Sequence, residues 1–235
     1  MTTARGFTLI EMAVALVIVA LLLSSFLVPL QTQVAQRKIF DSQNALNQIN
    51  DALIGFALAN GYLPCPDTTS GAGANDGIED VNTGSCVAAN NEGNVPWVTL
   101  GIPSTDAWGN FFHYRVTAAF AQRSPQPTFS LSSSGNLTVK CPAPACSPAY
   151  TYATTAPAVI LSYGPNGWGA INANIGAANP APTSTDELEN TNGDAIFVSR
   201  IPSAVGSASG EFDDIVTWLS VPVLFNRMVA AGKLP

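Results

Sequence analysis

The chain has 235 residues, of which 47% are hydrophobic and 11% are charged, so it can build one domain of ordinary size besides an apolar helix. Its net charge of -7 gives it no general attraction to nucleic-acid phosphates or to anionic lipid surfaces. We therefore expect no nucleic-acid partner.

The first feature in chain order is a short polar leader followed by a long apolar run. The segment RGFTLIEMAVALVIVALLL begins at Arg5, and the run continues to Leu30 with only two serines and one proline inside it. This length suits a membrane-spanning helix of ~20 residues. A secretory signal peptide would be followed by an Ala-x-Ala-like site, which we do not find after Leu30. Glu11 lies near the start of the run, where a carboxylate in hydrocarbon is costly unless it is paired.

The helix is predicted to continue beyond the apolar run. Four apolar residues recur at helical spacing while Gln, Asn and Asp fill the other face. Asn60-Gly61 suits a left-handed C-terminal cap. We therefore expect one helix from Phe7 to Asn60. The four apolar residues are Leu46, Ile49, Leu53 and Phe56.

The segment RGFTLIE and the apolar run after it resemble the processing site of type IV pilins and type II secretion pseudopilins. The resemblance implies that prepilin peptidase cleaves between Gly6 and Phe7 and methylates the new N-terminus at Phe7. It also implies that Glu11 of one subunit pairs with the Phe7 amine of a neighbour, which would neutralise both charges and fix the axial stagger of a filament. The alternative is that Glu11 lies at the membrane interface and directs its carboxylate to the headgroups.

Beyond Gly61 the sequence predicts a β-rich domain with long loops. Residues 62–97 are dense in Gly, Asn and Asp and predict an ordered loop. Strands are expected at 111–117, on both sides of Gly135, and in the segments AVILSYG and GDAIFVSRI. The Pro- and Ala-rich residues 141–157 predict a loop or an edge excursion. The C-terminal segment VPVLFNRMVAAGKLP predicts an amphipathic helix between Pro222 and Gly232.

All four cysteines follow the apolar run, in a part of the chain that a membrane helix could deliver outside the cytoplasm. They allow three pairings, of which the most local joins Cys65 to Cys86 and Cys141 to Cys146. Buried free thiols are the alternative. A Cys65–Cys86 bridge would stabilise the fold by roughly 3 kcal/mol in the chain-entropy model.

Two later segments resemble the major pseudopilin of type II secretion. SYGPNGWG at 162–169 and EFDDIVTW at 211–218 are similar to segments near the end of that protein, where a calcium ion orders the final loop. The resemblance implies that Asp214, and with it Asp213, binds calcium, a hard cation that prefers oxygen ligands. The alternative is that both acids solvate a turn before the last strand. No other cofactor is expected.

The residue inventory disfavours an enzyme. The single histidine, His113, excludes a two-histidine metal site, and the chain has neither Gly-x-Ser-x-Gly nor Cys-x-x-Cys. The tryptophans could form a ligand or sugar platform, although core packing is the commoner role of such side chains. They are Trp97, Trp108, Trp168 and Trp218.

These features together predict an α+β, pilin-like fold, in which a long N-terminal helix packs on an antiparallel sheet with long loops. We expect a type II secretion pseudopilin, a filament subunit acting in protein export. It would be held in the bacterial inner membrane by one helix, with a cytoplasmic N-terminus and a periplasmic domain. A minor type IV pilin acting in adhesion, motility or DNA uptake is the alternative.

The expected partners are prepilin peptidase, other pilin or pseudopilin subunits and an inner-membrane assembly platform. The expected parts of the chain are a leader (1–6), a transmembrane and filament-core helix (7–30), an amphipathic continuation of that helix (31–61) and a periplasmic β-rich domain (62–235).

Overall fold

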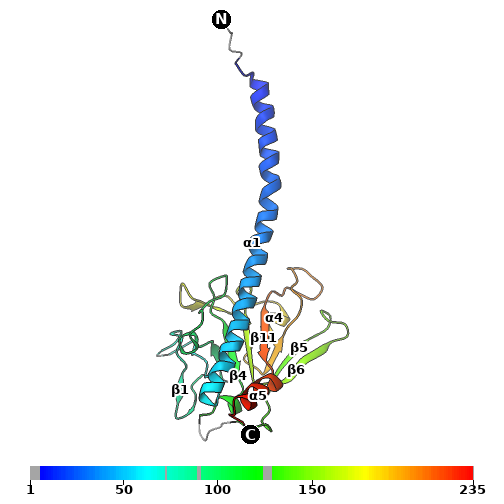
Figure 1. Cartoon of the computed structure of the whole chain (residues 1–235). Helices are drawn as coiled ribbons and strands as arrows, with labels where there is room; N and C mark the ends of the chain where they lie inside the picture. The colour runs from blue at the N-terminus through cyan, green and yellow to red at the C-terminus, as the bar shows by residue number, and fades with distance from the viewer. Residues whose placement is uncertain (1–5, 72, 89–90, 124–128, 235) are drawn as a thin grey trace. The chain divides into compact units, whose positions relative to one another are not determined.

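The computed structural model describes residues 6–71, 73–88, 91–123 and 129–234, and within the first helix it leaves the side chains of 23–29 undescribed. The chain divides into two units, residues 1–40 and 41–235, each of which is described by itself. Figure 1 follows the chain from its N-terminus to its C-terminus.

The first unit contains the N-terminal part of helix α1 (Leu9–Asn60), which begins two residues later than predicted. Every described side chain from Leu9 to Leu22 is exposed. No helix in the described part of the chain is long and apolar enough to cross a membrane. The predicted spanning segment, 7–30, includes 23–29, whose side chains lie outside the described residues.

Residues 41–60 of α1 belong to the second unit and carry a buried stripe at helical spacing. The helix ends at Asn60 as predicted, and Gly61 follows with φ +82°, its N–H donating to the Ala57 carbonyl at 2.8 Å. Phe56 differs from the prediction, because it is half-buried and lies edge-on against Tyr62 instead of in the core. The stripe consists of Ser42, Leu46, Ile49, Leu53 and Ala57.

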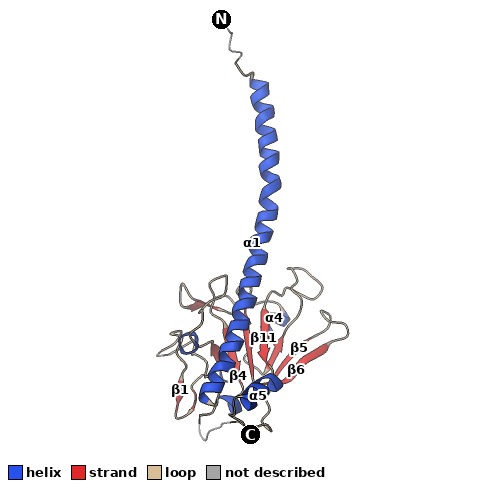
Figure 2. Cartoon of the chain, viewed as in Figure 1, coloured by secondary structure: helices blue, strands red, loops and turns tan. Residues whose placement is uncertain are grey.

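A four-stranded antiparallel sheet forms the middle layer of the second unit (Figure 2). Strand β7 (Ala158–Ser162) is buried along its whole length, because its two faces enter different cores. Ile160 packs in the core that contains the α1 stripe, whereas Val159 and Leu161 pack in the other. The order is β11 (Ile215–Leu219), β7, β4 (His113–Val116) and β3 (Glu92–Asn94).

A three-stranded sheet encloses the second core. Strand β5 (Leu137–Cys141) is central, with β10 (Ile196–Val198) on one side and β6 (Tyr150–Ala156) on the other. β5 and β6 are antiparallel, but β10 and β5 are parallel. The prediction of an antiparallel sheet is therefore correct for the larger sheet and wrong for this pair.

The remaining elements are short, apart from the C-terminal helix α5 (Val221–Ala230). As predicted, α5 has Pro222 in its first turn, and Gly232 with φ +67° follows its end. Its buried face carries Leu224 and Met228. The others are α2 (Trp97–Leu100), α3 (Ala118–Ala121), α4 (Thr185–Glu189), β1 (Val81–Asn82) with β2 (Ser85–Cys86), and β8 (Ile171–Asn172) with β9 (Ala177–Ala178).

One predicted strand is wrong, and the structure decides between the two alternatives for residues 141–157. Described residues 129–134 form no strand before Gly135, because Ser130 and Ser133 close a local turn through their own hydrogen bonds. For residues 141–157, where either a loop or an edge excursion was predicted, the structure has the edge strand β6 at 150–156. The structure has the local disulfide pairing, Cys65–Cys86 and Cys141–Cys146.

Candidate functional site

The residues of the predicted cleavage point are accessible. Gly6, Phe7 and Thr8 precede α1 without regular secondary structure, and the Phe7 side chain is 81% exposed. A peptidase needs access to the backbone at the bond that it cleaves. Gly6 and Phe7 are both exposed and outside regular secondary structure, so the Gly6–Phe7 bond meets this requirement.

Thr8 and Glu11 cap the first turn of α1 reciprocally. The Thr8 N–H and hydroxyl both donate to Glu11 Oε2 at 2.9 Å, and the Glu11 N–H donates to Thr8 Oγ1 at 3.3 Å. This arrangement is a capping box, which satisfies two backbone donors that a helix start otherwise leaves unpaired. Both residues follow the Gly6–Phe7 bond, so cleavage there would leave the cap in place.

A second candidate site is the acidic cluster, which consists of Glu187, Asp213 and Asp214. One carboxylate oxygen of each residue lies within 4.8 Å of those of the other two. Glu187 comes from α4, and the two aspartates directly precede β11. The sequence prediction included Asp213 and Asp214 but missed Glu187.

The two segments that resemble the major pseudopilin meet at this cluster. The Asn166 N–H, in SYGPNGWG, donates to Asp213 Oδ2 at 3.1 Å, and the Asn166 side-chain amide donates to Glu187 Oε1 at 3.2 Å. The Asp213 N–H also donates to Glu187 Oε1, at 3.1 Å. Asp214 Oδ2 accepts from the Asn190 side-chain amide at 2.8 Å.

Two carboxylate oxygens of the cluster remain without a partner. Glu187 Oε2 and Asp213 Oδ1 are buried and make no hydrogen bond to the described residues. Glu187 is only 1% exposed, so water does not readily solvate its carboxylate. An unpaired buried oxygen costs free energy, which a cation ligated by both oxygens would offset. The acidic cluster could therefore bind a metal ion.

Burial and mutual repulsion disfavour three negative charges in the acidic cluster. Burial, together with the neighbouring carboxylates of Glu187 and Glu211, raises the pKa of Asp213 to about 7, although the hydrogen bond from the Asn166 N–H acts to lower it. Burial likewise raises the pKa values of Asp214 and Glu187 above their ordinary range. A divalent cation would compensate this repulsion.

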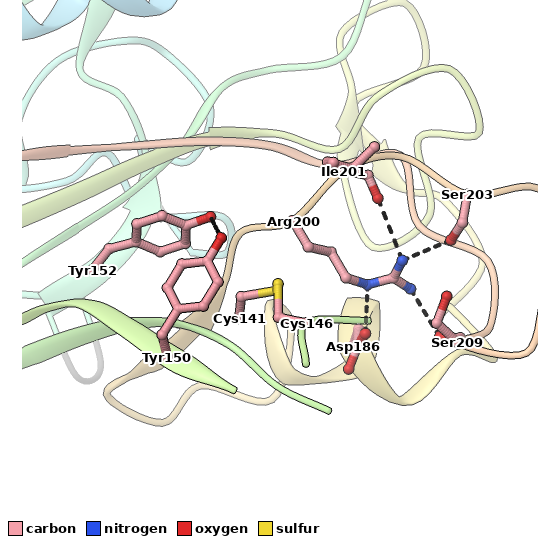
Figure 3. Close-up of a disulfide and its surroundings, with 9 residues drawn as sticks. All are labelled: Cys141, Cys146, Tyr150, Tyr152, Asp186, Arg200, Ile201, Ser203 and Ser209. Carbon is pink, nitrogen blue, oxygen red and sulfur yellow. Dashed lines mark hydrogen bonds and ion pairs between the residues drawn. A yellow bond between two sulfur atoms is a disulfide. The ribbon is translucent and has the colours of Figure 1, made fainter. Parts of the chain in front are cut away.

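Arg200 connects the two elements that supply the acidic cluster. Its Nε lies 2.5 Å from Asp186 Oδ2 on α4, and its Nη2 donates to the Ser209 carbonyl at 2.9 Å (Figure 3). Its guanidinium carbon also lies 4.5 Å from the centre of the Phe212 ring. The guanidinium therefore holds α4 against the loop that leads to Asp213.

His113 belongs to a buried ionic group in the larger sheet. Its Nε2 lies 2.8 Å from Glu92 Oε1, and Arg115 Nη1 lies 2.5 Å from Glu92 Oε2. Burial acts to raise the Glu92 pKa, but hydrogen bonding with His113 and the positive charges nearby outweigh it and lower that pKa. These contacts join β3 to β4, and they give His113 a structural role.

Comparison with known proteins identifies the N-terminal segment. Residues 1–27 match the family model of the prokaryotic N-terminal methylation motif. No curated protein and no solved structure matches the chain. The match does not extend to 162–169 or 211–218, so the resemblance of those segments to the major pseudopilin stays a prediction.

The methylation motif has direct consequences for the chain. It implies processing by prepilin peptidase, anchoring of the N-terminus in a membrane and assembly with other pilin subunits. Proteins with this motif have a structural role and not an enzymatic one. The chain therefore carries, at residues 1–27, the N-terminal motif that supports a type IV pilin or pseudopilin family.

Proposed function

We propose that the protein is a structural subunit of a pilin-like periplasmic filament, and specifically a type II secretion pseudopilin acting in protein export. The observation that carries this proposal is the methylation motif at residues 1–27 with its accessible Gly6–Phe7 bond. One helix would hold the unassembled subunit in the bacterial inner membrane. Its N-terminus would lie in the cytoplasm and residues 62–235 in the periplasm, where disulfides such as Cys65–Cys86 persist.

Assembly would bury the apolar side chains that α1 exposes in a single chain. Residues such as Leu9, Ile10 and Leu16 are more than half exposed, and packing them against neighbouring helices supplies cohesion. An inner-membrane assembly platform would deliver each subunit to the growing filament.

The Glu11 carboxylate would set the register between subunits. Thr8 engages Oε2, and no contact to the described residues occupies Oε1. Oε1 can therefore accept a hydrogen bond from the cationic Phe7 amine of a neighbour without loss of the helix cap. A charge-assisted bond of this kind is strong where water is excluded, and it compensates a carboxylate in lipid.

The acidic cluster would hold calcium and fix the segment before β11. Its carboxylate oxygens suit a hard cation, and Glu187 Oε2 and Asp213 Oδ1 lack other partners among the described residues. Calorimetric titration of the purified full chain with CaCl₂ tests this role. Saturable binding that is lost in Asp214→Asn and Glu187→Gln, but kept in the exposed Asp51→Asn, is expected. Equal binding by all four proteins would contradict it.

A gene-deletion strain tests the filament role. Secretion, surface adhesion and transformation should be measured separately after complementation with the native gene or with Glu11→Gln. We expect the deletion to abolish secretion, the native gene to restore it and the variant not to. Loss of adhesion or transformation with normal secretion would replace the export function with that of a minor type IV pilin.

A further inference from the structure

A groove beside the edge strand β6 has the chemistry of a saccharide site. It is a cavity of about 300 Å³, lined by residues 152–156 of β6 and by residues 218–222, which join β11 to α5. The larger sheet ends at β11 and the smaller one at β6, so the groove lies where the free edges of both sheets approach each other. We call it the tyrosine groove, after Tyr152.

The tyrosine groove is free of charge. None of the residues that line it, all of which the structure describes, is Asp, Glu, Lys, Arg or His. The whole chain nevertheless has 16 acidic and 9 basic residues. A phosphate, a nucleic acid or an acidic peptide would therefore find no counter-charge in the groove, and its ligand should be neutral.

Three hydroxyl groups in the groove are available to a ligand. Those of Thr154, Thr155 and Ser220 make no hydrogen bond to any described residue, although each can donate one and accept two. Ser220 is the N-cap of α5, yet its side chain makes no capping bond. Small polar sites that orient a ligand use such groups, and hydroxyls match the hydroxyls of a sugar.

Aromatic rings form one wall of the groove and are held in place. The centre of the Tyr152 ring lies 5.4 Å from that of the Trp218 ring, and the two rings are tilted. It lies 4.8 Å from the centre of the Tyr150 ring, and these two rings are T-shaped. The Tyr150 and Tyr152 hydroxyls are 2.8 Å apart. Figure 3 shows that the two hydroxyls point toward each other. The Cys141–Cys146 disulfide closes the loop before this strand. Despite these contacts, the Tyr152 side chain stays 42% exposed.

We infer that the tyrosine groove binds a neutral saccharide. The apolar C–H face of a sugar ring packs on an aromatic ring, while its hydroxyl groups exchange hydrogen bonds with Thr and Ser side chains. The volume is at the lower end of the range for small-molecule sites, which suits one or two sugar rings. The rings are already ordered, so binding would cost little side-chain entropy. This site is independent of the filament role of α1.

An extended peptide is the competing occupant. β6 pairs only with β5 in the described part of the chain, and a free edge can accept another strand. Strand addition would use backbone groups of β6, whereas the features that distinguish this groove are side chains: free hydroxyls and an exposed ring. The observations therefore favour the saccharide, and the peptide becomes an outcome of the test.

Saturation-transfer NMR on the full chain tests the inference. The protein is held in lauryldimethylamine oxide micelles, because that detergent has no sugar headgroup. The probes are maltohexaose, cellohexaose, chitohexaose and mannohexaose, with a Thr- and Val-rich strand-forming peptide as the second arm. We expect transfer to at least one hexasaccharide, and no transfer to any of the four would overturn the proposal. Binding of the peptide alone would assign the β6 edge to strand addition and would also overturn it.

Variants of the groove locate the binding. Tyr152→Ala should lower the affinity for the saccharide by about tenfold, because the ring is lost. Ser220→Ala should lower that affinity by several-fold. Tyr152→Phe keeps the ring and should bind within about threefold of the native protein. Ile201→Ala, at an exposed position outside the lining, should bind as the native protein does. Unchanged affinity in Tyr152→Ala, with an unchanged melting temperature, would place the saccharide elsewhere and contradict the assignment.

Discussion

Gly164 lies directly against Asp213. A Cβ atom added to Gly164 would be 2.2 Å from the Asp213 carbonyl oxygen and 2.6 Å from its Oδ1. The glycine also has φ +61°, a left-handed conformation that other residues rarely adopt. The segment 162–169 thus approaches Asp213 too closely for a residue that has a Cβ atom, so glycine is required at position 164.

Gly164→Ala should displace Asp213 and weaken cation binding by the acidic cluster. Gly176→Ala is the matched control, because Gly176 has φ +62° but no heavy atom within 4 Å of the added Cβ. Both variants bear a similar backbone strain of about 1 kcal/mol, so their difference reports the contact alone. Calcium titration should show a loss of at least about tenfold for Gly164→Ala only. Equal calcium affinities in the two variants would show that Asp213 does not bind the cation.

Substitutions at Thr8 and Glu11 separate helix capping from pairing between subunits. Glu11→Gln keeps an oxygen that can accept from the Thr8 N–H but loses the charge. Thr8→Ala keeps the charge and loses the side-chain cap, at a cost of about 1 kcal/mol. We expect Glu11→Gln to abolish filament assembly and Thr8→Ala to reduce it only mildly, as measured by electron microscopy of sheared material. Normal filaments in Glu11→Gln would reject the charge pair.

Arg200 should contribute strongly to the stability of the second unit. Its side chain is 2% exposed and that of Asp186 is 14% exposed, so Arg200→Leu leaves a mostly buried carboxylate unpaired. We expect a loss of about 3–5 kcal/mol in the free energy of unfolding by urea. Lys140→Leu is the control, because the Lys140–Glu189 pair is more exposed. Loss of this pair should lower the free energy of unfolding by only about 1 kcal/mol or less. Similar losses in both variants would contradict this account.

Asp67 should make the stability of the fold depend on pH. The residue is fully buried, and its carboxylate accepts from the Asn75 and Gly77 N–H groups. Burial, together with the charges of Asp76 and Asp80, raises its pKa to about 6. A group with a raised pKa stabilises the fold fully below its unfolded pKa, and this contribution is lost as the pH rises through the folded pKa.

The test is urea unfolding between about pH 4 and pH 7, which spans the unfolded and folded pKa values of Asp67. The native protein should lose more stability over this range than Asp67→Asn, which does not titrate. Asp51→Asn, an exposed substitution on α1, should show the same dependence of the free energy of unfolding on pH as the native protein. If the free energies of unfolding of the native protein and of Asp67→Asn change equally with pH, Asp67 is not the titrating group.

Local patterns in the sequence predicted the elements whose signals are local. The end of α1 at Asn60, the doubly buried β7 and the boundaries of α5 follow from glycine and proline positions and from runs of apolar residues. Strand β3 was missed because its residues, Glu-Gly-Asn, have no strand propensity. Its place depends on the tertiary contacts of Glu92 with His113 and Arg115.

The sequence located the candidate sites only in part. Glu187 was missed because it lies 26 residues before Asp213, and no spacing rule connects them. Its only local signal is the helix start at Ser184, whose hydroxyl accepts from the Glu187 N–H. The tyrosine groove was hidden for a similar reason, since Tyr152 and Trp218 meet only through the sheet topology. Of the four tryptophans proposed for a platform, only Trp218 lines this groove.

The mass of the mature chain is the most direct test of the proposed filament subunit. The protein should be purified from cells that contain prepilin peptidase, and its N-terminal peptide analysed by mass spectrometry. We predict a chain that begins at N-methylated Phe7 and lacks residues 1–6. An intact Met1–Gly6 segment in assembled material would contradict the account, because no Phe7 amine would then exist to pair with Glu11.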